Sequence, residues 1–167
     1  MSPQYGFDLE INSDISMGSG LGGSSALATG ILGALNEMKL DNKVDKHSLC
    51  NLAYQAERLN TGIVGGWQDF FSTAFGGFNW IEFEKNDVHV NSLNIDQNII
   101  NELEYNLLLF SVGKKRNSSI LQRKLIKNKL NLRQSNEIKK VSKKMKNSLL
   151  KGNVKNFGDL LDESWQL

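Results

Sequence analysis

Residues 18–26 read Gly18-Ser19-Gly20-Leu21-Gly22-Gly23-Ser24-Ser25-Ala26. An alternating segment, Phe7 to Ile15, precedes them, and a long apolar run, Ala26 to Met38, follows them. This order predicts a strand, a glycine loop and a helix. Glycines allow positive φ and a close backbone approach to a ligand, while the N–H groups and partial positive charge of a helix start attract phosphate. The stretch fits either a phosphate-binding loop or a packing turn.

Two well-known phosphate loops do not match this stretch. A Walker loop has Lys before its Ser/Thr, and Gly23 stands there instead. A dinucleotide fingerprint fitted to Gly18, Gly20 and Gly23 requires an acidic residue that closes a second strand, and no predicted strand leads into the acids at that distance. The hydroxyls of Ser24 and Ser25 suit either a helix cap or a metal carried by a phosphate.

The composition predicts an ordinary globular protein. The chain has 167 residues, of which 40% are hydrophobic and 23% charged, enough for a sizeable core. It shows no bilayer-spanning apolar run and no signal-peptide pattern, so we expect a cytoplasmic protein without a membrane partner. Cys50 is the sole cysteine, which excludes a disulfide within the chain and predicts a buried small apolar residue. Two histidines and one cysteine are too few for a structural zinc site.

The charge is distributed unevenly, although the net charge is only +2. Basic residues dominate from Lys114 to Lys155, where Glu137 is the only acid. Such a run suits either binding of nucleic acid or anionic lipid, or solvated helix faces. The lysines follow helical spacing and are not interleaved with aromatic residues, which favours solvated faces. Nucleic acid is therefore not the expected partner.

Hydrophobic periodicity and turn residues predict an alternation of helices and strands. We expect a core along the second helix at Leu49, Leu52, Ala53 and Ala56, and turns at 41–42 and 76–77. Strands are predicted over 7–15, 78–83, 88–93 (a hairpin with the strand before it) and 105–112. Helices are predicted over 24–38, from an Asp45 cap to about 60, and over 69–75, 95–103, 118–129, 132–150 and 154 to the end, with a loop over 61–68.

A second cluster, later in the sequence than the glycine loop, contains two carboxylates. Glu57 lies near the end of the second predicted helix, and a glycine-containing loop then leads to Asp69. Phosphoryl transfer uses one acid to hold Mg²⁺ and another to orient or deprotonate the attacking hydroxyl. The alternatives are a surface pair of Glu57 with Arg58 and a helix cap at Asp69.

Together the two clusters resemble the GHMP kinase family of galactokinase, homoserine kinase, mevalonate kinase and phosphomevalonate kinase. The glycine loop is similar to the family's phosphate-binding second motif, and the Glu57 to Gly77 segment to its acid-bearing loop. The branch that this chain resembles most comprises the D-glycero-D-manno-heptose 7-phosphate kinases. Further resemblance lies in Ser13-Asp14-Ile15, Ala53-Tyr54, Trp67-Gln68, Ala74 to Asn79, Ile81-Glu82-Phe83, Gly113, Arg116, Ser118-Ser119 and Leu160 to Trp165.

The resemblance implies an α+β fold and a set of roles. The family's N-terminal domain is similar to the second domain of a ribosomal small-subunit protein, and its C-terminal domain is ferredoxin-like. Residues 1–104 would form part of the first and 105–167 part of the second. ATP and Mg²⁺ would be the cofactors and a sugar phosphate the substrate. Asp69 would be the base or would position the hydroxyl, Glu57 and Ser24 (or Ser25) would bind Mg²⁺, and the ATP phosphates would lie on Gly18, Ser19, Gly20, Leu21, Gly22, Gly23, Ser24 and Ser25.

The sequence also departs from the family pattern. Gly23 replaces a frequent Ser, and Ser16-Met17 replace prolines before the loop. The family's first and third motifs are absent, so we expect the central portion of a kinase about twice as long. The missing strands predict self-association or a complementing chain, and poor activity of the chain alone. A catalytically inactive subunit that acts through a partner is the alternative.

Overall fold

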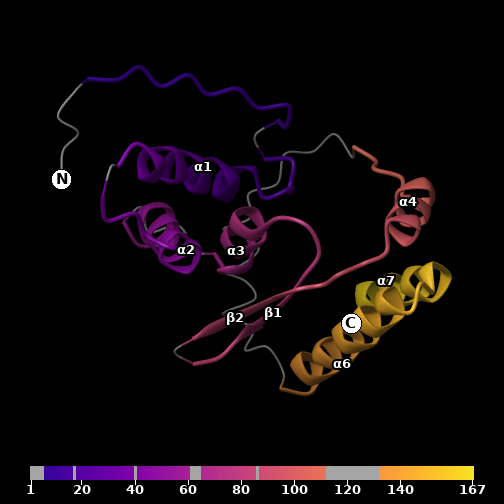
Figure 1. Cartoon of the computed structure of the whole chain (residues 1–167). Helices are drawn as coiled ribbons and strands as arrows, with labels where there is room; N and C mark the ends of the chain where they lie inside the picture. Colours follow the sequence, from indigo (N-terminus) through magenta and orange to yellow (C-terminus); the bar gives the residue numbers. More distant parts are fainter. Residues whose placement is uncertain (1–5, 17, 40, 61–64, 86, 112–131) are drawn as a thin grey trace.

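The structure, a computed structural model, describes residues 6–16, 18–39, 41–60, 65–85, 87–111 and 132–167. It is a mixture of helices and one small antiparallel sheet, as the α+β prediction required (Figure 1). The elements are α1 (Gly23–Glu37), α2 (Lys46–Tyr54), the π-helical η1 (Gln55–Leu59), α3 (Gln68–Phe75), β1 (Asn79–Phe83), β2 (Val88–Ser92), α4 (Gln97–Asn106), α6 (Leu132–Leu150) and α7 (Val154–Gln166). No helix among the described residues has the length and apolar character needed to span a membrane.

Helices α1, α2 and α3 lie together beside the hairpin of β1 and β2 (Figure 1). The buried residues of this part are Cys50, Ala53, Phe70, Phe71 and Val88. Apolar burial of this kind is the main driving force of folding, and edge-to-face aromatic pairs add to it. The core thus fixes the end of α2 against the start of α3, and these are the segments that carry Glu57 and Asp69.

The connection from α1 to α2 is held by side-chain caps. Asn36 forms two hydrogen bonds with the backbone of Val44: its Nδ2 donates to the carbonyl at 3.0 Å, and its Oδ1 accepts from the amide at 2.9 Å. Asp45 caps α2 and accepts from the amide of Ser48 at 2.9 Å, as predicted. Asn42 lies between them with φ 58°, which confirms the predicted turn. The α1–α2 angle is therefore set by specific polar contacts.

A second core joins the hairpin end, α4, α6 and α7. Its buried residues are Ile95, Leu103, Leu149 and Val154. Helices α6 and α7 lie antiparallel to each other on the far side of the hairpin from α1 (Figure 1). The ammonium of Lys146 on α6 lies 4.3 Å from the ring centroid of Trp80 on β1, within cation–π range. Residues on both sides of position 104 thus share one core, and the division into 1–104 and 105–167 stays a prediction.

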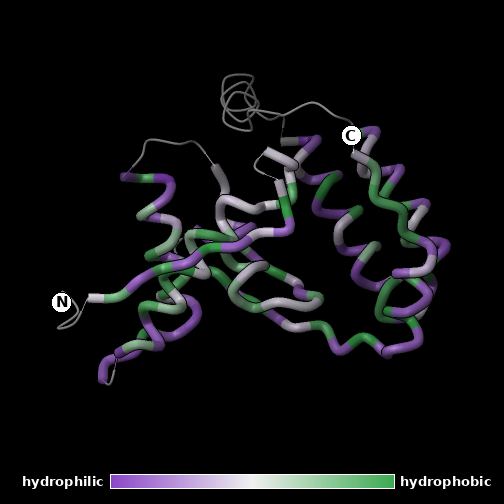
Figure 2. The backbone as a smooth tube through the Cα atoms, turned by 90° about the horizontal axis from the view of Figure 1, so that it is seen from above, coloured by the Kyte–Doolittle hydropathy of each residue, from purple (hydrophilic) through white to green (hydrophobic). Residues whose placement is uncertain are grey.

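The two predicted strands outside the hairpin are wrong. Residues 7–13 form no strand, and Phe7, Leu9 and Ile11 are exposed. Figure 2 shows hydrophobic and hydrophilic residues interleaved along this extended segment. The predicted buried strand over 105–112 is replaced by the end of α4 and by an exposed extended stretch, Leu107 to Phe110, while Val112 lies outside the described residues. A strand requires a neighbour for its N–H and C=O groups, and the described residues supply none for these segments.

The buried residues of two helices differ from the apolar pattern of the sequence. The buried residues of α1 are Ser25, Thr29 and Asn36, whereas Leu27 in its apolar run is exposed. In the second helix Ala53 is buried and Leu49 half-buried as predicted, but Leu52 and Ala56 are exposed. Hydrophobic composition identified α1 as a helix without identifying its buried face. The helix predicted over 118–129 and most of the loop over 61–68 lie outside the described residues.

Candidate functional site

The glycine loop alternates glycine in the left-handed region with residues of negative φ. Gly18, Gly20 and Gly22 have φ of 80°, 83° and 71°, while Ser19 and Leu21 between them do not have positive φ. Alternation of this kind is found where successive backbone N–H groups form a concave anion site. A Cβ built at Gly20 would meet nothing within 4 Å, so the space beside the loop is open.

Helix α1 begins within this loop. The first helical hydrogen bond runs from the amide of Ala26 to the carbonyl of Gly22 at 3.0 Å. The amides of Gly23, Ser24 and Ser25 precede that bond and point away from the helix, as the first N–H groups of any α-helix do. Gly22 is the cap residue and no side chain caps the helix, so Ser24 and Ser25 are not caps. Their hydroxyls are engaged elsewhere.

The structure brings Ser24 and Glu57 into direct contact. The Ser24 hydroxyl donates to Oε1 of Glu57, which lies in η1 at the end of α2. π-helical turns are rare and often occur at functional sites. The carboxylate is largely buried, with 10% of its side chain exposed, so Glu57 is not one half of a surface charge pair. The predicted metal-binding pair is therefore adjacent in space, and its role as a ligand set remains a proposal.

Arg58 belongs to the same arrangement and was not among the predicted site residues. Its Nη1 lies 3.5 Å from Oε1 of Glu57, and its Nη2 donates to the Ser25 hydroxyl at 3.3 Å. The sequence offered two interpretations of Glu57-Arg58, and a surface pair was one of them. The buried position of Arg58 depends on Gly65 and Phe70, which no local pattern in the sequence connects to it.

Asp69 also lies beside the glycine loop. It lies in the first turn of α3, whose cap is Trp67, so it is not the helix cap either. The indole of Trp67 packs on Tyr54 with the ring centroids 4.7 Å apart, which fixes the start of α3 against the end of α2. A Cβ built at Gly22 would lie 3.7 Å from Cγ of Asp69. Glu57 and Asp69 thus both lie beside the start of α1.

The donor atoms at this place suit a hard divalent cation. A hydroxyl and a carboxylate are oxygen ligands of the type that Mg²⁺ prefers, and Mg²⁺ commonly keeps waters and substrate phosphates as its other ligands. No group of three or more His, Cys, Asp or Glu residues that could hold a metal occurs in the part of the chain that the structure describes. Ser24 and Glu57 fit a cation that arrives with a phosphate better than a metal held by protein alone.

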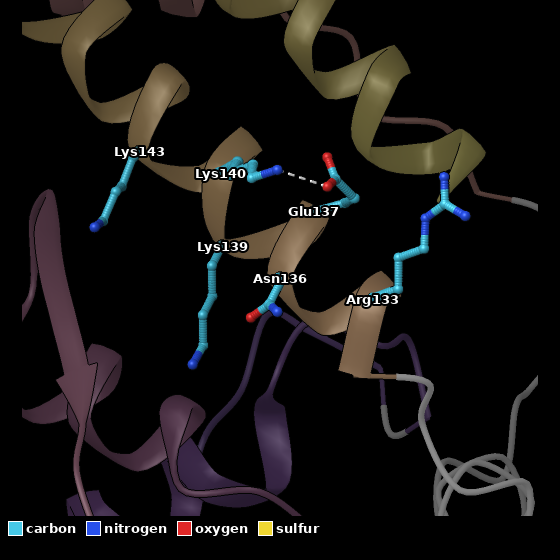
Figure 3. Close-up of a pocket in the computed structure, with 6 residues that line it drawn as sticks. All are labelled: Arg133, Asn136, Glu137, Lys139, Lys140 and Lys143. Carbon is cyan, nitrogen blue, oxygen red and sulfur yellow. Dashed lines mark hydrogen bonds and ion pairs between the residues drawn. The ribbon is translucent and has the colours of Figure 1, made fainter.

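A hollow on the surface of α6 lies apart from these residues (Figure 3). Arg133, Asn136, Glu137, Lys139, Lys140 and Lys143 line it. Lys140 pairs with Glu137 at 2.8 Å, and Lys144 on the same helix pairs with Glu163 of α7 at 3.1 Å. These contacts agree with solvated, partly paired helix faces. The hollow contains none of the predicted site residues.

Comparison with known proteins agrees with this geometry. Residues 1–77 match the sequence model of the GHMP kinases N terminal domain. The chain is 38% identical over 165 residues to D-glycero-alpha-D-manno-heptose 7-phosphate kinase of Campylobacter jejuni, and 38% identical over 85 residues to mevalonate kinase of Archaeoglobus fulgidus. A crystal structure described as a sugar kinase from Campylobacter jejuni superposes with a TM-score of 0.67 at 33% identity, over 93% of this chain and 44% of that one.

These matches confirm the resemblance: residues 1–77 match the GHMP kinase N-terminal domain, and the relatives include a heptose 7-phosphate kinase and a sugar kinase structure. The heptose kinase match covers 96% of this chain and 48% of the relative, and the mevalonate kinase match covers 51% and 29%. The chain therefore spans about half the length, or less, of the relatives it matches.

Proposed function

We propose that this chain forms part of a cytoplasmic, ATP-dependent sugar kinase that acts on a sugar phosphate. The acceptor in this proposal is the anomeric hydroxyl of a heptose 7-phosphate. The observation that carries the proposal is the contact of Ser24 with Glu57 beside the glycine loop. The 38% identity to a heptose 7-phosphate kinase along nearly the whole chain supports the choice of sugar.

The glycine loop would bind the phosphates of ATP. Alternating positive φ at Gly18, Gly20 and Gly22 and the free first amides of α1 supply donors without a competing side chain. The dipole of α1 adds partial positive charge at the same point. Ser24 and Glu57 would hold Mg²⁺, which when bound neutralises charge that develops on the phosphates.

Asp69 would act on the acceptor hydroxyl. In the proposed reaction the sugar oxygen forms a bond to the γ-phosphorus of ATP, the bond from that phosphorus to ADP breaks, and the hydroxyl proton passes to the Asp69 carboxylate. An anomeric hydroxyl is more acidic than an ordinary alcohol, so orientation by Asp69 would supply much of its effect. The position of Asp69 against Gly22 supports this role, because the carboxylate lies beside the glycine loop.

A second candidate is a catalytically inactive GHMP-fold subunit that acts through a partner chain. Two observations favour it. The chain spans 48% of the heptose kinase it matches, and two extended segments, 7–13 and 107–110, expose large apolar side chains. Exposed strand-like segments readily pair with another chain. In this candidate a second copy or a complementing chain would cover them, and 1–104 and 105–167 would each be part of a larger domain.

Thermal unfolding with nucleotide tests whether the glycine loop binds ATP. Millimolar Mg-ATP should raise the melting temperature, because a ligand that binds the folded state at 100 times its Kd adds about 2.7 kcal/mol. Ser24→Ala and Glu57→Gln should reduce the shift, and Asp69→Asn should leave it nearly unchanged while it removes turnover. Binding without turnover, with and without heptose 7-phosphate, would favour the inactive subunit. No shift with Mg-ATP would contradict a phosphate-binding role of the glycine loop and therefore the kinase.

A further inference from the structure

Arg58 connects the three segments that carry the candidate site. Its guanidinium bonds to Glu57 on its own turn and to Ser25 in the first turn of α1. The same group lies 5.6 Å from the ring centroid of Phe70, the residue after Asp69. The side chain is 10% exposed, so these contacts are protected from water. A single cation therefore touches the phosphate-loop helix, η1 and α3.

Gly65 lies directly against the guanidinium of Arg58. A Cβ built at Gly65 would lie 2.5 Å from Cζ and Nε of Arg58, so a side chain there would displace the guanidinium from its present position. Nε is buried and has no hydrogen-bond partner among the described residues. Both Nη groups, in contrast, have partners in Glu57 and Ser25. These two contacts therefore determine where the guanidinium lies. Lysine cannot replace it, because one ammonium cannot imitate the planar fork that reaches both Glu57 and Ser25.

We propose that Arg58 is a positioning residue for the Mg²⁺-nucleotide site, an inference that rests on the proposed function. Glu57 Oε1 accepts a hydrogen bond from the Ser24 hydroxyl, and that bond would be lost if both oxygens bound a cation. The contacts of Arg58 with Glu57 and Ser25 would then keep η1 and the start of α1 together. Partners that orient a metal ligand without touching the metal commonly change affinity 10- to 100-fold.

The direction in which Arg58→Met changes Mg²⁺-dependent ATP binding distinguishes a positioning role from a purely electrostatic one. A cation beside a bound metal repels it, so on charge alone Arg58→Met should strengthen Mg²⁺-dependent binding. If Arg58 positions Glu57, the same substitution should weaken ATP binding at saturating Mg²⁺ about tenfold and raise the Mg²⁺ concentration for half-maximal binding. Arg58→Lys keeps the charge and should not restore the affinity. Lys46→Met is the matched control, because it removes another cation that lies over an aromatic ring, at 5.4 Å from Phe75, away from the site.

Binding of a fluorescent ATP analogue would be measured for the three variants, whose folding is checked by circular dichroism. Amide hydrogen exchange of residues 22–26 and 65–71 in the nucleotide-free protein gives a second readout, and we expect faster exchange there in Arg58→Met and Arg58→Lys than in Lys46→Met. Unchanged or tighter Mg-ATP binding in both Arg58 variants would overturn the inference. If the unmodified chain binds no nucleotide, the proposed function fails. The exchange rates then decide the role of Arg58 separately. Exchange in the Arg58 variants equal to that in Lys46→Met would overturn the positioning role as well, whereas faster exchange in the Arg58 variants alone would retain it.

Discussion

The hydroxyl of Ser24 donates a hydrogen bond to the carboxylate of Glu57, although 33 residues separate the two in the chain. The next residue of each segment repeats the pairing, since Arg58 donates to Ser25 at 3.3 Å. Two consecutive residues of α1 thus meet two consecutive residues of η1. A two-point attachment fixes both the distance and the rotation of one element against the other, which a single contact cannot do.

The Ser24–Glu57 contact should appear as an energetic coupling. We expect Ser24→Ala and Glu57→Gln each to lower the free energy of unfolding, and the double variant to lose less than the sum, with a coupling of about 1 kcal/mol. Urea unfolding of the four proteins measures it. As a control, Ser24→Ala combined with Glu82→Gln on the exposed side of β1 should be additive. Additivity in the Ser24–Glu57 cycle would show that the contact contributes nothing to stability.

Alanine substitutions at Gly22, the cap of α1, and at Gly30, inside α1, should change the free energy of unfolding in opposite directions. Gly22 has φ 71°, where a Cβ costs roughly 1–2 kcal/mol, so Gly22→Ala should destabilise the protein and disturb the loop beside Asp69. Gly30 lies inside α1 with nothing within 4 Å of a built Cβ, so Gly30→Ala should stabilise by about 0.5–1 kcal/mol. Urea unfolding of both variants tests the pair. Equal effects of the two substitutions would contradict the left-handed conformation at Gly22.

The elements that the sequence predicted well are those whose signals are local. The cap at Asp45, the turn at 76–77 and the bounds 132–150 of α6 follow from residues within a few positions of each other, and the structure confirms them. Strands depend on a distant partner, so the alternation over 7–15 produced an extended backbone without a sheet. Leu107 shows the same effect, since its φ of −94° and ψ of 136° lie in the extended β region without a strand partner among the described residues.

The candidate site was predictable to a different extent. The residues alone left the glycine loop open between phosphate binding and packing, and Glu57 and Asp69 gained their roles through the family resemblance. Their convergence on the start of α1 depends on how α2 and α3 pack through Tyr54, Trp67 and Phe70, which is tertiary information. Arg58 was not predicted as a site residue for the same reason, because its surroundings include Gly65 and Phe70, which are distant in the local sequence pattern.

Cys50 should be unreactive in the folded protein. Its side chain is fully buried, and burial raises the pKa of the thiol to about 11, so little thiolate exists at neutral pH. Labelling by iodoacetamide at neutral pH should be slow in buffer and fast in urea, as followed by mass spectrometry. Rapid labelling of the native chain would show that α2 opens locally, because the thiol also contacts the carbonyl of Phe70.

Asp45 should make a pH-dependent contribution to the stability of α2. The amide and hydroxyl of Ser48 hold its pKa below the ordinary value of 3.8. A lowered folded pKa means that the contribution is complete above 3.8 and disappears as the pH falls through the lowered value. Asp45→Asn retains a capping oxygen but not the charge, so its urea midpoint should lie below that of the unmodified chain at neutral pH, and the two midpoints should converge as the pH falls through the lowered pKa of Asp45. A difference that does not change with pH would exclude the carboxylate as its cause.

The exposed stretch after α4 should control association of the chain. Leu108 and Leu109 are 78% and 82% exposed and follow each other in extended backbone, a combination that favours pairing with another strand. Replacing Leu108 by Lys should shift the protein toward the monomer in light scattering at several concentrations, with little change in its free energy of unfolding, because the side chain makes no buried contact. Leu103→Lys is the contrasting variant, since Leu103 is buried in the second core and its replacement should unfold that part. If the unmodified chain is already monomeric at high concentration, neither a second copy nor strand pairing between copies covers this stretch, and a complementing chain becomes the occupant to test.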